Sequence, residues 1–260
     1  RGGSLLLQYL ISTMELNMGS KLSIYSRSID LTPQIQIRVP TVGEVMKEEE
    51  TYLSLVSILT SSPFQYMVHL DDMGIDYATI TSYEMFLELF PLCASNDLSI
   101  LFGDIKTNDF DVFKNPQNGT KVIYSPSQDL IIDELIYNQL SDLVRKMNLL
   151  KKDRRKPGNK EAREYLLEKE RKKIKRRERN RKARGYSESE FEKVIIALVN
   201  NKDFKYDYSS ILDLSIYTFY QSFNQIQTNI NFNNVMRGVY AGTVDVSKLK
   251  DKSCLSWIPE

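Results

Sequence analysis

Basic residues are concentrated in one internal segment of this chain. Residues 145–184 contain 20 Lys or Arg against 6 Asp or Glu, a net charge of +14, while the rest of the 260 residues carries a net charge of −13. Like charges three or four positions apart on a helix repel by roughly 0.2–0.5 kcal/mol per pair. Such a segment is unsuited to the interior of a domain. We therefore expect an acidic body with a basic insert.

A turn divides the basic segment into a short part and a long part. The Pro157, Gly158 and Asn159 sequence interrupts helical patterning, and Asn159 is a suitable N-cap for a helix that continues to Arg184. Gly185 then ends the pattern. Few apolar residues lie in this stretch, namely Ala162, Tyr165, Leu166 and Ile174. The pattern predicts a long helix that acts as a spacer and contributes little to a core.

Helix starts in the remainder of the chain carry a recognisable signature. A Ser or Thr followed three residues later by Glu or Gln satisfies two backbone N–H groups reciprocally. This pair occurs at Thr41 and Glu44, Ser62 and Gln65, Thr81 and Glu84, and Ser187 and Glu190. It predicts helices at about 41–59, 64–70, 82–93 and from residue 187, and further helices are expected after Asp133 and at about 215–229. We read Gly238 and Gly242 as turn residues.

Strand patterns occupy shorter stretches. Residues 22–39 read as extended, because Ile35, Ile37 and Val39 alternate with polar residues. Residues 98–102 form an apolar run that is short enough for a buried strand. Residues 122–124 and 130–132 flank a turn and predict a hairpin.

These elements predict an α+β fold class. We expect an N-terminal α+β domain at 21–150, a basic helical spacer at 151–186 and a small helical C-terminal domain at 187–260. Residues 1–20 are expected to be a flexible or partner-docked arm, or a remnant that is not native to the chain. The apolar run at 5–11 is far shorter than the roughly 20 residues that a membrane span needs, so no membrane partner is expected.

The composition argues against most catalytic sites. With one histidine and two cysteines, the chain lacks the ligands for a Cys/His zinc site. No phosphate-binding or dinucleotide-binding glycine motif occurs. His69, Asp71, Asp72 and Asp76 are close in sequence and could in principle bind a divalent metal. A solvated helix end before Gly74 is the simpler interpretation. We therefore expect no enzyme, no catalytic residue, no metal and no cofactor.

The basic segment is the candidate binding site. Its proposed contact residues share a positive charge and lie in the short and long parts of the segment: Lys151, Lys152, Arg154, Arg155, Lys156, Arg171, Lys172, Lys173, Lys175, Arg176, Arg177, Arg179, Arg181, Lys182 and Arg184. Three environments are possible for these basic side chains: an acidic protein surface, nucleic-acid phosphate, or solvent alone. Residues 41–113 contain 13 acidic and 2 basic residues, which suits a contact within the chain or between copies of it.

Several stretches resemble a known group of proteins. The stretches are IQIRVPTVGEV at 35–45, LVS at 55–57, LDDMGID at 70–76, RRKP at 154–157 with the basic helix, and GVYAGTVD at 238–245 with Trp257. Together they resemble uncharacterised tailed-bacteriophage proteins of low-GC Gram-positive hosts. The resemblance covers most of residues 22–258. It implies virion structure or tail assembly, and it brings no functional residues with it.

The sequence favours a non-enzymatic phage structural or tail-assembly protein, a chaperone or adaptor that acts through charge-complementary protein contacts. Its expected partners are other phage structural proteins, with a homo-oligomer allowed, and it would act in the host cytoplasm during assembly or in the virion. The alternative is a nucleic-acid-binding protein that uses residues 151–184. A third hypothesis is a metal-dependent nuclease built on His69, Asp71 and Asp72.

Overall fold

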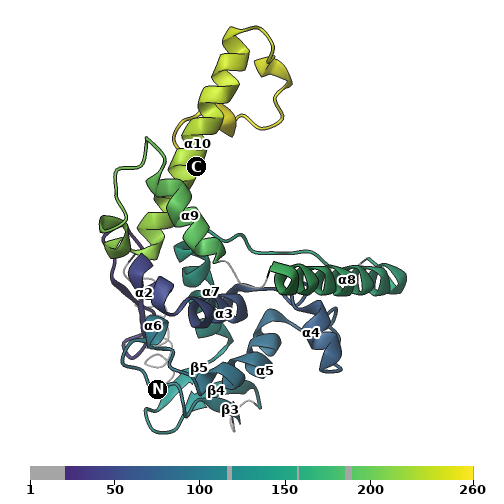
Figure 1. Cartoon of the computed structure of the whole chain (residues 1–260). Helices are drawn as coiled ribbons and strands as arrows, with labels where there is room; N and C mark the ends of the chain where they lie inside the picture. The colour runs from purple at the N-terminus through teal and green to yellow at the C-terminus, as the bar shows by residue number, and fades with distance from the viewer. Residues whose placement is uncertain (1–20, 116–118, 157, 185–188, 260) are drawn as a thin grey trace, which may run out of the picture.

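The computed structural model describes residues 21–115, 119–156, 158–184 and 189–259, with Arg181 and Arg184 described by their backbone alone. It confirms a mixed α+β chain, with helices and two small sheets. Two long helices, α8 and α10, extend away from the remaining elements (Figure 1). The expectation for residues 1–20 lies outside the described residues.

Both sheets are antiparallel. Strands β1 (Ser28–Asp30) and β2 (Gln36–Arg38) pair with Ile29 opposite Ile37. Strands β3 (Asp111–Lys114), β4 (Lys121–Ser125) and β5 (Leu130–Ile132) follow the order β3-β4-β5. The predicted hairpin is confirmed as β4 and β5. The sequence reading missed β3, because this edge strand buries no side chain and lacks an apolar alternation.

The helices of the body begin largely where the capping pattern predicts. They are α2 (Val42–Lys47), α3 (Glu49–Thr60), α4 (Met67–Asp72), α5 (Ser82–Ala94) and α7 (Glu134–Met147). Full capping boxes form at Thr41 with Glu44 and at Thr81 with Glu84. Asp133 caps α7 as predicted. The single helix expected at 41–59 is broken at Glu48, where the backbone has φ −126° and ψ 37°.

The predictions for residues 98–102 and for Ser62 were wrong. The apolar run at 98–102 forms the short helix α6 (Ser99–Phe102), not a strand, and the side chain of Asp97 accepts a hydrogen bond from the Ser99 N–H. A short run that is buried on all sides has no period that separates the two structures. Ser62 does not begin a helix. Its N–H donates to the Gln65 side chain, but its hydroxyl donates to Asp153.

The main core lies where α3, α5 and α7 meet the sheets. Tyr52, Phe86 and Tyr137 are fully buried there, and the rings of Phe86 and Tyr137 stack with centroids 4.7 Å apart. The same buried cluster continues into Phe191 and Phe219 of the C-terminal helices. Packing therefore connects the two regions on either side of the basic segment, and the predicted division into domains stays a prediction.

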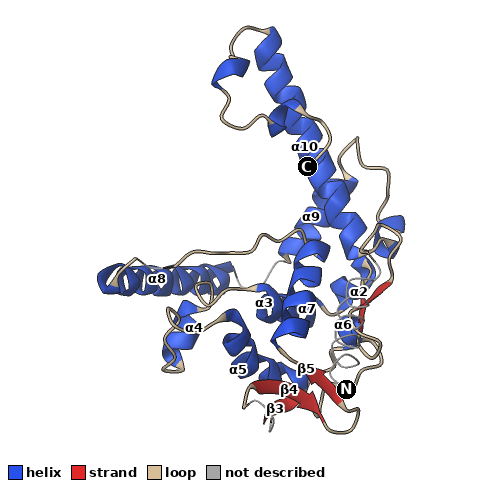
Figure 2. Cartoon of the chain, turned by 180° about the vertical axis from the view of Figure 1, so that it is seen from behind, coloured by secondary structure: helices blue, strands red, loops and turns tan. Residues whose placement is uncertain are grey.

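The base of α10 (Ile216–Tyr240) is hydrogen-bonded to the body. Val42 N–H donates to the Leu214 carbonyl, and Ile216 N–H donates to the Pro40 carbonyl, both at 2.8 Å. Figure 2 shows the rest of α10 leaving the body together with the chain that follows it. That chain contains the short 3-10 helices η3 (Val246–Lys248) and η4 (Ser253–Leu255).

The remaining C-terminal elements differ modestly from their predictions. Helix α9 (Glu190–Val199) begins at Ser189, whose hydroxyl accepts from the Glu192 N–H; the predicted cap, Ser187, lies outside the described residues. A 3-10 turn, η2 (Ser210–Asp213), then leads to α10. Helix α10 extends past residue 229 and includes Gly238, so the turn predicted there was wrong. Gly242 does lie in a turn, with φ +70°. No helix in the described ranges is long and apolar enough to cross a membrane.

Candidate anion-binding helix

Helix α8 (Lys160–Arg184) is the structural form of the basic segment. It begins as predicted, because the Asn159 side chain accepts a hydrogen bond of 2.7 Å from the Ala162 N–H. In Figure 1, α8 lies beside α4 and extends to one side of the body, and by Ser189 the chain is again at the body, where the Ser189 hydroxyl donates to Glu49 at 2.9 Å. Its two halves have different surroundings.

The first half of α8 is anchored by apolar contacts. Leu166 and Leu167 are half-buried and pack against a small buried cluster. The cluster consists of Met67, Leu70, Tyr77, Met85 and Leu89, which come from α4, α5 and the loop between them. Together the two leucines attach the first half of α8 to the body.

Ion pairs reinforce this anchor. Arg171 Nη2 lies 2.7 Å from an Asp71 carboxylate oxygen and 2.5 Å from one of Asp72. About two turns earlier, Arg163 Nη1 lies 2.5 Å from Asp76. Hydrogen bonds to Asp71 and then Asp72 raise the pKa of the Arg171 guanidinium above its already high value. The acidic surface predicted around residues 41–113 thus supplies a counterpart for the anchored half of α8.

These contacts change the interpretation of the acidic residues near His69. The sequence reading assumed that Asp71 and Asp72 point in different directions at a solvated helix end. That was wrong, because both carboxylates sit at the last turn of α4 and bind one guanidinium. His69 is exposed, with its ring 6.1 Å from that of Tyr66. In the described ranges, no group of three or more Asp, Glu, His or Cys could hold a metal ion.

The second half of α8 has a free cationic surface. Lys172 and Lys173 form ion pairs within the helix, with Glu168 and Glu170. The next cations are exposed and pair with no residue that the structure describes: Lys175, Arg176, Arg177, Arg179 and Lys182. The side chains of Arg181 and Arg184 lie outside the description.

Most of these cations share one face. With 3.6 residues per turn, five of them fall within about 120° of the helix circumference. We call this set the distal cation stripe; it comprises Lys172, Lys175, Arg176, Arg179 and Lys182. Leu167, which packs toward α4, lies about 120° around the helix from the centre of the stripe, whereas Arg171 lies at the edge of the stripe, next to Lys182 and Lys175. The centre of the stripe therefore does not face α4.

The short part of the basic segment is less uniform than the sequence implied. Lys151, Lys152, Arg154 and Lys156 are exposed. Arg155 binds Asp153 through two hydrogen bonds of 2.9 and 2.8 Å, and its guanidinium lies 4.7 Å from the Phe64 ring centroid. Arg155 thus holds the loop that leads into α8.

Arg145, which the charge count placed at the start of the basic segment, belongs to the core. Only 6% of it is exposed. Its Nε and Nη2 donate to the Thr60 carbonyl at 3.3 and 3.1 Å, and Nη1 pairs with Asp142. A count of charge along the chain cannot separate a buried structural arginine from exposed ones.

Comparison with known proteins gives a match to a family model over the last part of the chain. Residues 180–260 match the family model of the YomV second domain. The YomV second domain match covers the last residues of α8, α9, α10 and the tail, and so less than half of the chain. It is consistent with a phage-associated protein. Neither a curated protein nor a solved structure matches the chain.

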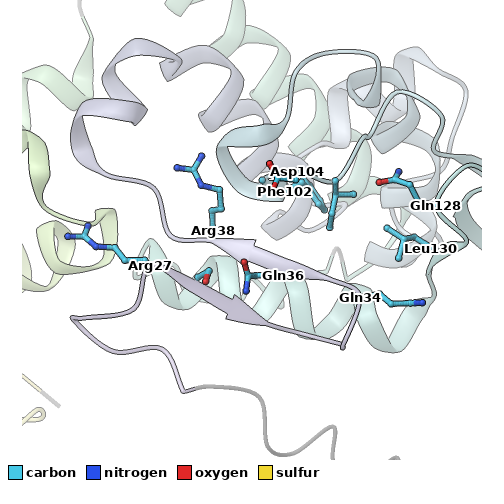
Figure 3. Close-up of a pocket in the computed structure, with 11 residues that line it drawn as sticks. Arg27, Gln34, Gln36, Arg38, Phe102, Asp104, Gln128 and Leu130 are labelled. Atoms are coloured by element: carbon cyan, nitrogen blue, oxygen red, sulfur yellow. The ribbon is translucent and has the colours of Figure 1, made fainter.

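A cleft in the body is a second candidate site, and it lies outside the residues that the YomV second domain match covers. This cleft of about 700 Å³ is lined by two arginines and three glutamines, Arg27, Arg38, Gln34, Gln36 and Gln128, among other residues (Figure 3). Sequence reading did not single it out, because its residues come from three separated stretches. Most of its polar groups are engaged within the chain.

Several contacts show this engagement. Arg38 pairs with Glu44 and donates to the Ser99 carbonyl at 3.2 Å. Gln128 bonds to both the N–H and the carbonyl of Lys106. The cleft therefore offers fewer free charged groups than the distal cation stripe, which remains the stronger candidate site.

Proposed function

We propose that this chain is a non-enzymatic, phage-associated binding protein that holds nucleic-acid phosphate on the distal cation stripe. The observation that carries the proposal is that four cations in the second half of α8 are exposed and form no ion pair with a residue that the structure describes: Lys175, Arg176, Arg179 and Lys182. Binding phosphate would release condensed counterions and relieve the like-charge repulsion along the helix.

The chemistry of the second half of α8 favours nucleic acid over a protein surface. Ile174 is its last large apolar residue, and only Ala183 follows among the residues up to 184. Protein–protein interfaces carry an apolar and aromatic centre. Protein–DNA interfaces are more polar and much more positively charged. The distal stripe resembles the second kind.

The length of the distal cation stripe also suits a DNA duplex. Residues 172–182 span about 15 Å along the helix axis. Duplex DNA presents about nine negative charges over that length. Over this length the duplex therefore offers more phosphates than the five cations of the stripe can neutralise. Because the centre of the stripe does not face α4, a duplex can approach it without displacing the anchor.

A titration tests this function. Binding of a labelled 20-base-pair duplex is measured at 50 and 200 mM salt for the native chain and for a variant with Lys175, Arg176, Arg179 and Lys182 changed to Gln. We expect the variant to lose most of its affinity and the slope of log K against log salt to fall by up to about 3.6. The matched control changes four other exposed lysines to Gln: Lys202, Lys205, Lys250 and Lys252. Equal binding by both variants would refute a site on the stripe.

A second function has one specific observation in its favour. The anchored half of α8 already binds aspartates of a protein surface, through Arg171 and Arg163. An adaptor or tail-assembly chaperone could use the distal stripe in the same way on an acidic phage structural protein. Titration with poly-glutamate and with duplex DNA at equal charge separates the two. Tight binding of poly-glutamate without binding of DNA would support the adaptor.

A further inference from the structure

The sign of the charge reverses along one face of helix α8. At 3.6 residues per turn, six charged side chains fall within about 60° of the helix circumference. All six are exposed. In chain order they are three glutamates followed by three cations: Glu161, Glu164, Glu168, Lys175, Arg179 and Lys182. We call this set the sign-reversing face.

The sign-reversing face does not contact the body. Helix α8 packs on the body through Leu166 and Leu167. Around the helix, the centre of the face lies about 90° from Leu167 and about 170° from Leu166. Figures 1 and 2 show α8 at one side of the body, beside α4. Because its side chains are also exposed, the face is accessible to a partner.

The order of the charges identifies a second copy of α8 as the partner. A two-fold axis beside residues 171 and 172 reverses the helix, so that the cations of one copy lie level with the glutamates of the other. The level pairs are Glu161 with Lys182, Glu164 with Arg179, and Glu168 with Lys175. Each pair forms twice in a symmetric dimer. A partner of one charge would match only half of this face, whereas a reversed copy matches all of it.

The cations beside the axis do not oppose this arrangement. Arg171 binds both Asp71 and Asp72 of its own chain. Lys172 Nζ lies 2.6 Å from a carboxylate oxygen of Glu168. Their charges are therefore largely neutralised before the two copies meet.

We propose that α8 pairs antiparallel with α8 of a second copy along the sign-reversing face. None of the six residues is apolar, so the contact is weak and salt screens it. It occupies Lys175, Arg179 and Lys182, which also belong to the distal cation stripe. Self-association and nucleic-acid binding therefore exclude each other. This exclusion rests on the proposed function, whereas the pairing itself does not.

Two charge-reversed variants of the full chain test the pairing. One variant has a face that is basic throughout, and it carries Glu161→Lys, Glu164→Lys and Glu168→Lys. The other has a face that is acidic throughout, and it carries Lys175→Glu, Arg179→Glu and Lys182→Glu. Each variant should repel its own copy and attract the other variant.

Sedimentation equilibrium of the nuclease-treated proteins at low salt measures these associations. The native chain should dimerise, and each variant alone should dimerise more weakly by about tenfold or more. The equimolar mixture of the two variants should form a heterodimer. A native chain that stays monomeric would overturn the proposal, and so would a mixture no more associated than its components. Undiminished self-association of the glutamate variant would indicate a head-to-tail contact with the acidic surface of residues 41–113, which also contradicts the pairing.

Cross-linking tests the register and covers the case in which a triple variant loses part of its helix. In chains with Cys93 and Cys254 changed to Ser, Glu168→Cys in one chain and Lys175→Cys in another should form a mixed disulfide under mild oxidation. Lys173→Cys, exposed on the opposite side of α8, should not form one with Glu168→Cys. Equal cross-linking of the two combinations, or none in either, contradicts the proposed register.

Addition of duplex DNA to the native dimer separates this inference from the proposed function. The dimer should dissociate as the duplex binds. A dimer that binds no DNA would refute the proposed function and leave the pairing standing. A dimer that binds DNA and keeps both protein copies together would refute the exclusion.

Discussion

Arg171 binds two adjacent carboxylates of α4, with its Nη2 atom 2.7 Å from Asp71 and 2.5 Å from Asp72. Arg171 lies 100 positions after Asp71 and 99 positions after Asp72 in the chain. Their contact lies near the middle of α8, beyond the half-buried Leu166 and Leu167. Among the described residues it is the last ion pair that joins α8 to another element of the body.

Removing the Arg171 contact should loosen α8 without unfolding the chain. In Arg171→Gln, amide hydrogen exchange in the second half of α8 should accelerate, because the helix then depends on its apolar anchor. The loss in the free energy of unfolding should stay below about 1 kcal/mol, since partly exposed ion pairs contribute little. Lys172→Gln is the control, because it removes a pair within the helix only. The same exchange in both variants would contradict the anchoring role.

Arg145 should matter for stability and not for binding. Arg145→Ala leaves the Thr60 carbonyl, buried beside it, without the two donors that it now has. We expect the free energy of unfolding in urea to fall by about 2 kcal/mol or more. Lys146→Ala, exposed on the same helix, should change it by less than about 0.5 kcal/mol. Equal effects would show that Arg145 is not a core residue.

Acid should weaken the capping box at the start of α5. Hydrogen bonds from Thr81 hold the pKa of Glu84 below its ordinary value of 4.5. A group with a lowered folded pKa stabilises the fold fully above the unfolded pKa, and this contribution is lost as pH falls through the folded pKa. The loss of unfolding free energy between pH 7 and pH 3 should therefore be smaller in Glu84→Gln than in the native chain. Glu88→Gln, exposed on the same helix and outside the capping box, is the matched control. The same change of pH dependence in both variants would contradict the role of the box.

Gly238 should be required for the tail to pack on α10. A Cβ atom at this position would lie 2.6 Å from Val244 Cγ2, well inside contact distance. Gly238→Ala should therefore displace the tail and speed tryptic cleavage after Lys248 and Lys250, even though alanine favours the helix. Gly238→Ala combined with Val244→Ala removes the clash and should restore the native rate. Fast cleavage in the double variant would point to another cause.

Predictions based on local hydrogen bonding were the most successful. The capping boxes at Thr41 and Thr81, and the caps at Asp133 and Asn159, all form as the sequence indicates. Each depends on groups within three residues of one another, so the sequence contains the whole interaction. Predictions based on short apolar runs were weaker. Residues 98–102 became a helix, because burial on all sides removes the periodicity that separates helix from strand.

At the candidate site, too, some features follow from the local sequence and others depend on contacts between distant parts of the chain. By itself, the sequence determined where α8 begins, how far it extends and that it is strongly basic, because these follow from an N-cap, a helical pattern and a charge count. Only the tertiary structure decided which cations contact other parts of the chain and which stay exposed to solvent. Arg145 is buried in the core, and Arg171 forms ion pairs with carboxylates of α4. The cations of the distal stripe are exposed. Such contacts join residues far apart in the chain, and their geometry exists only once the core has placed the elements side by side.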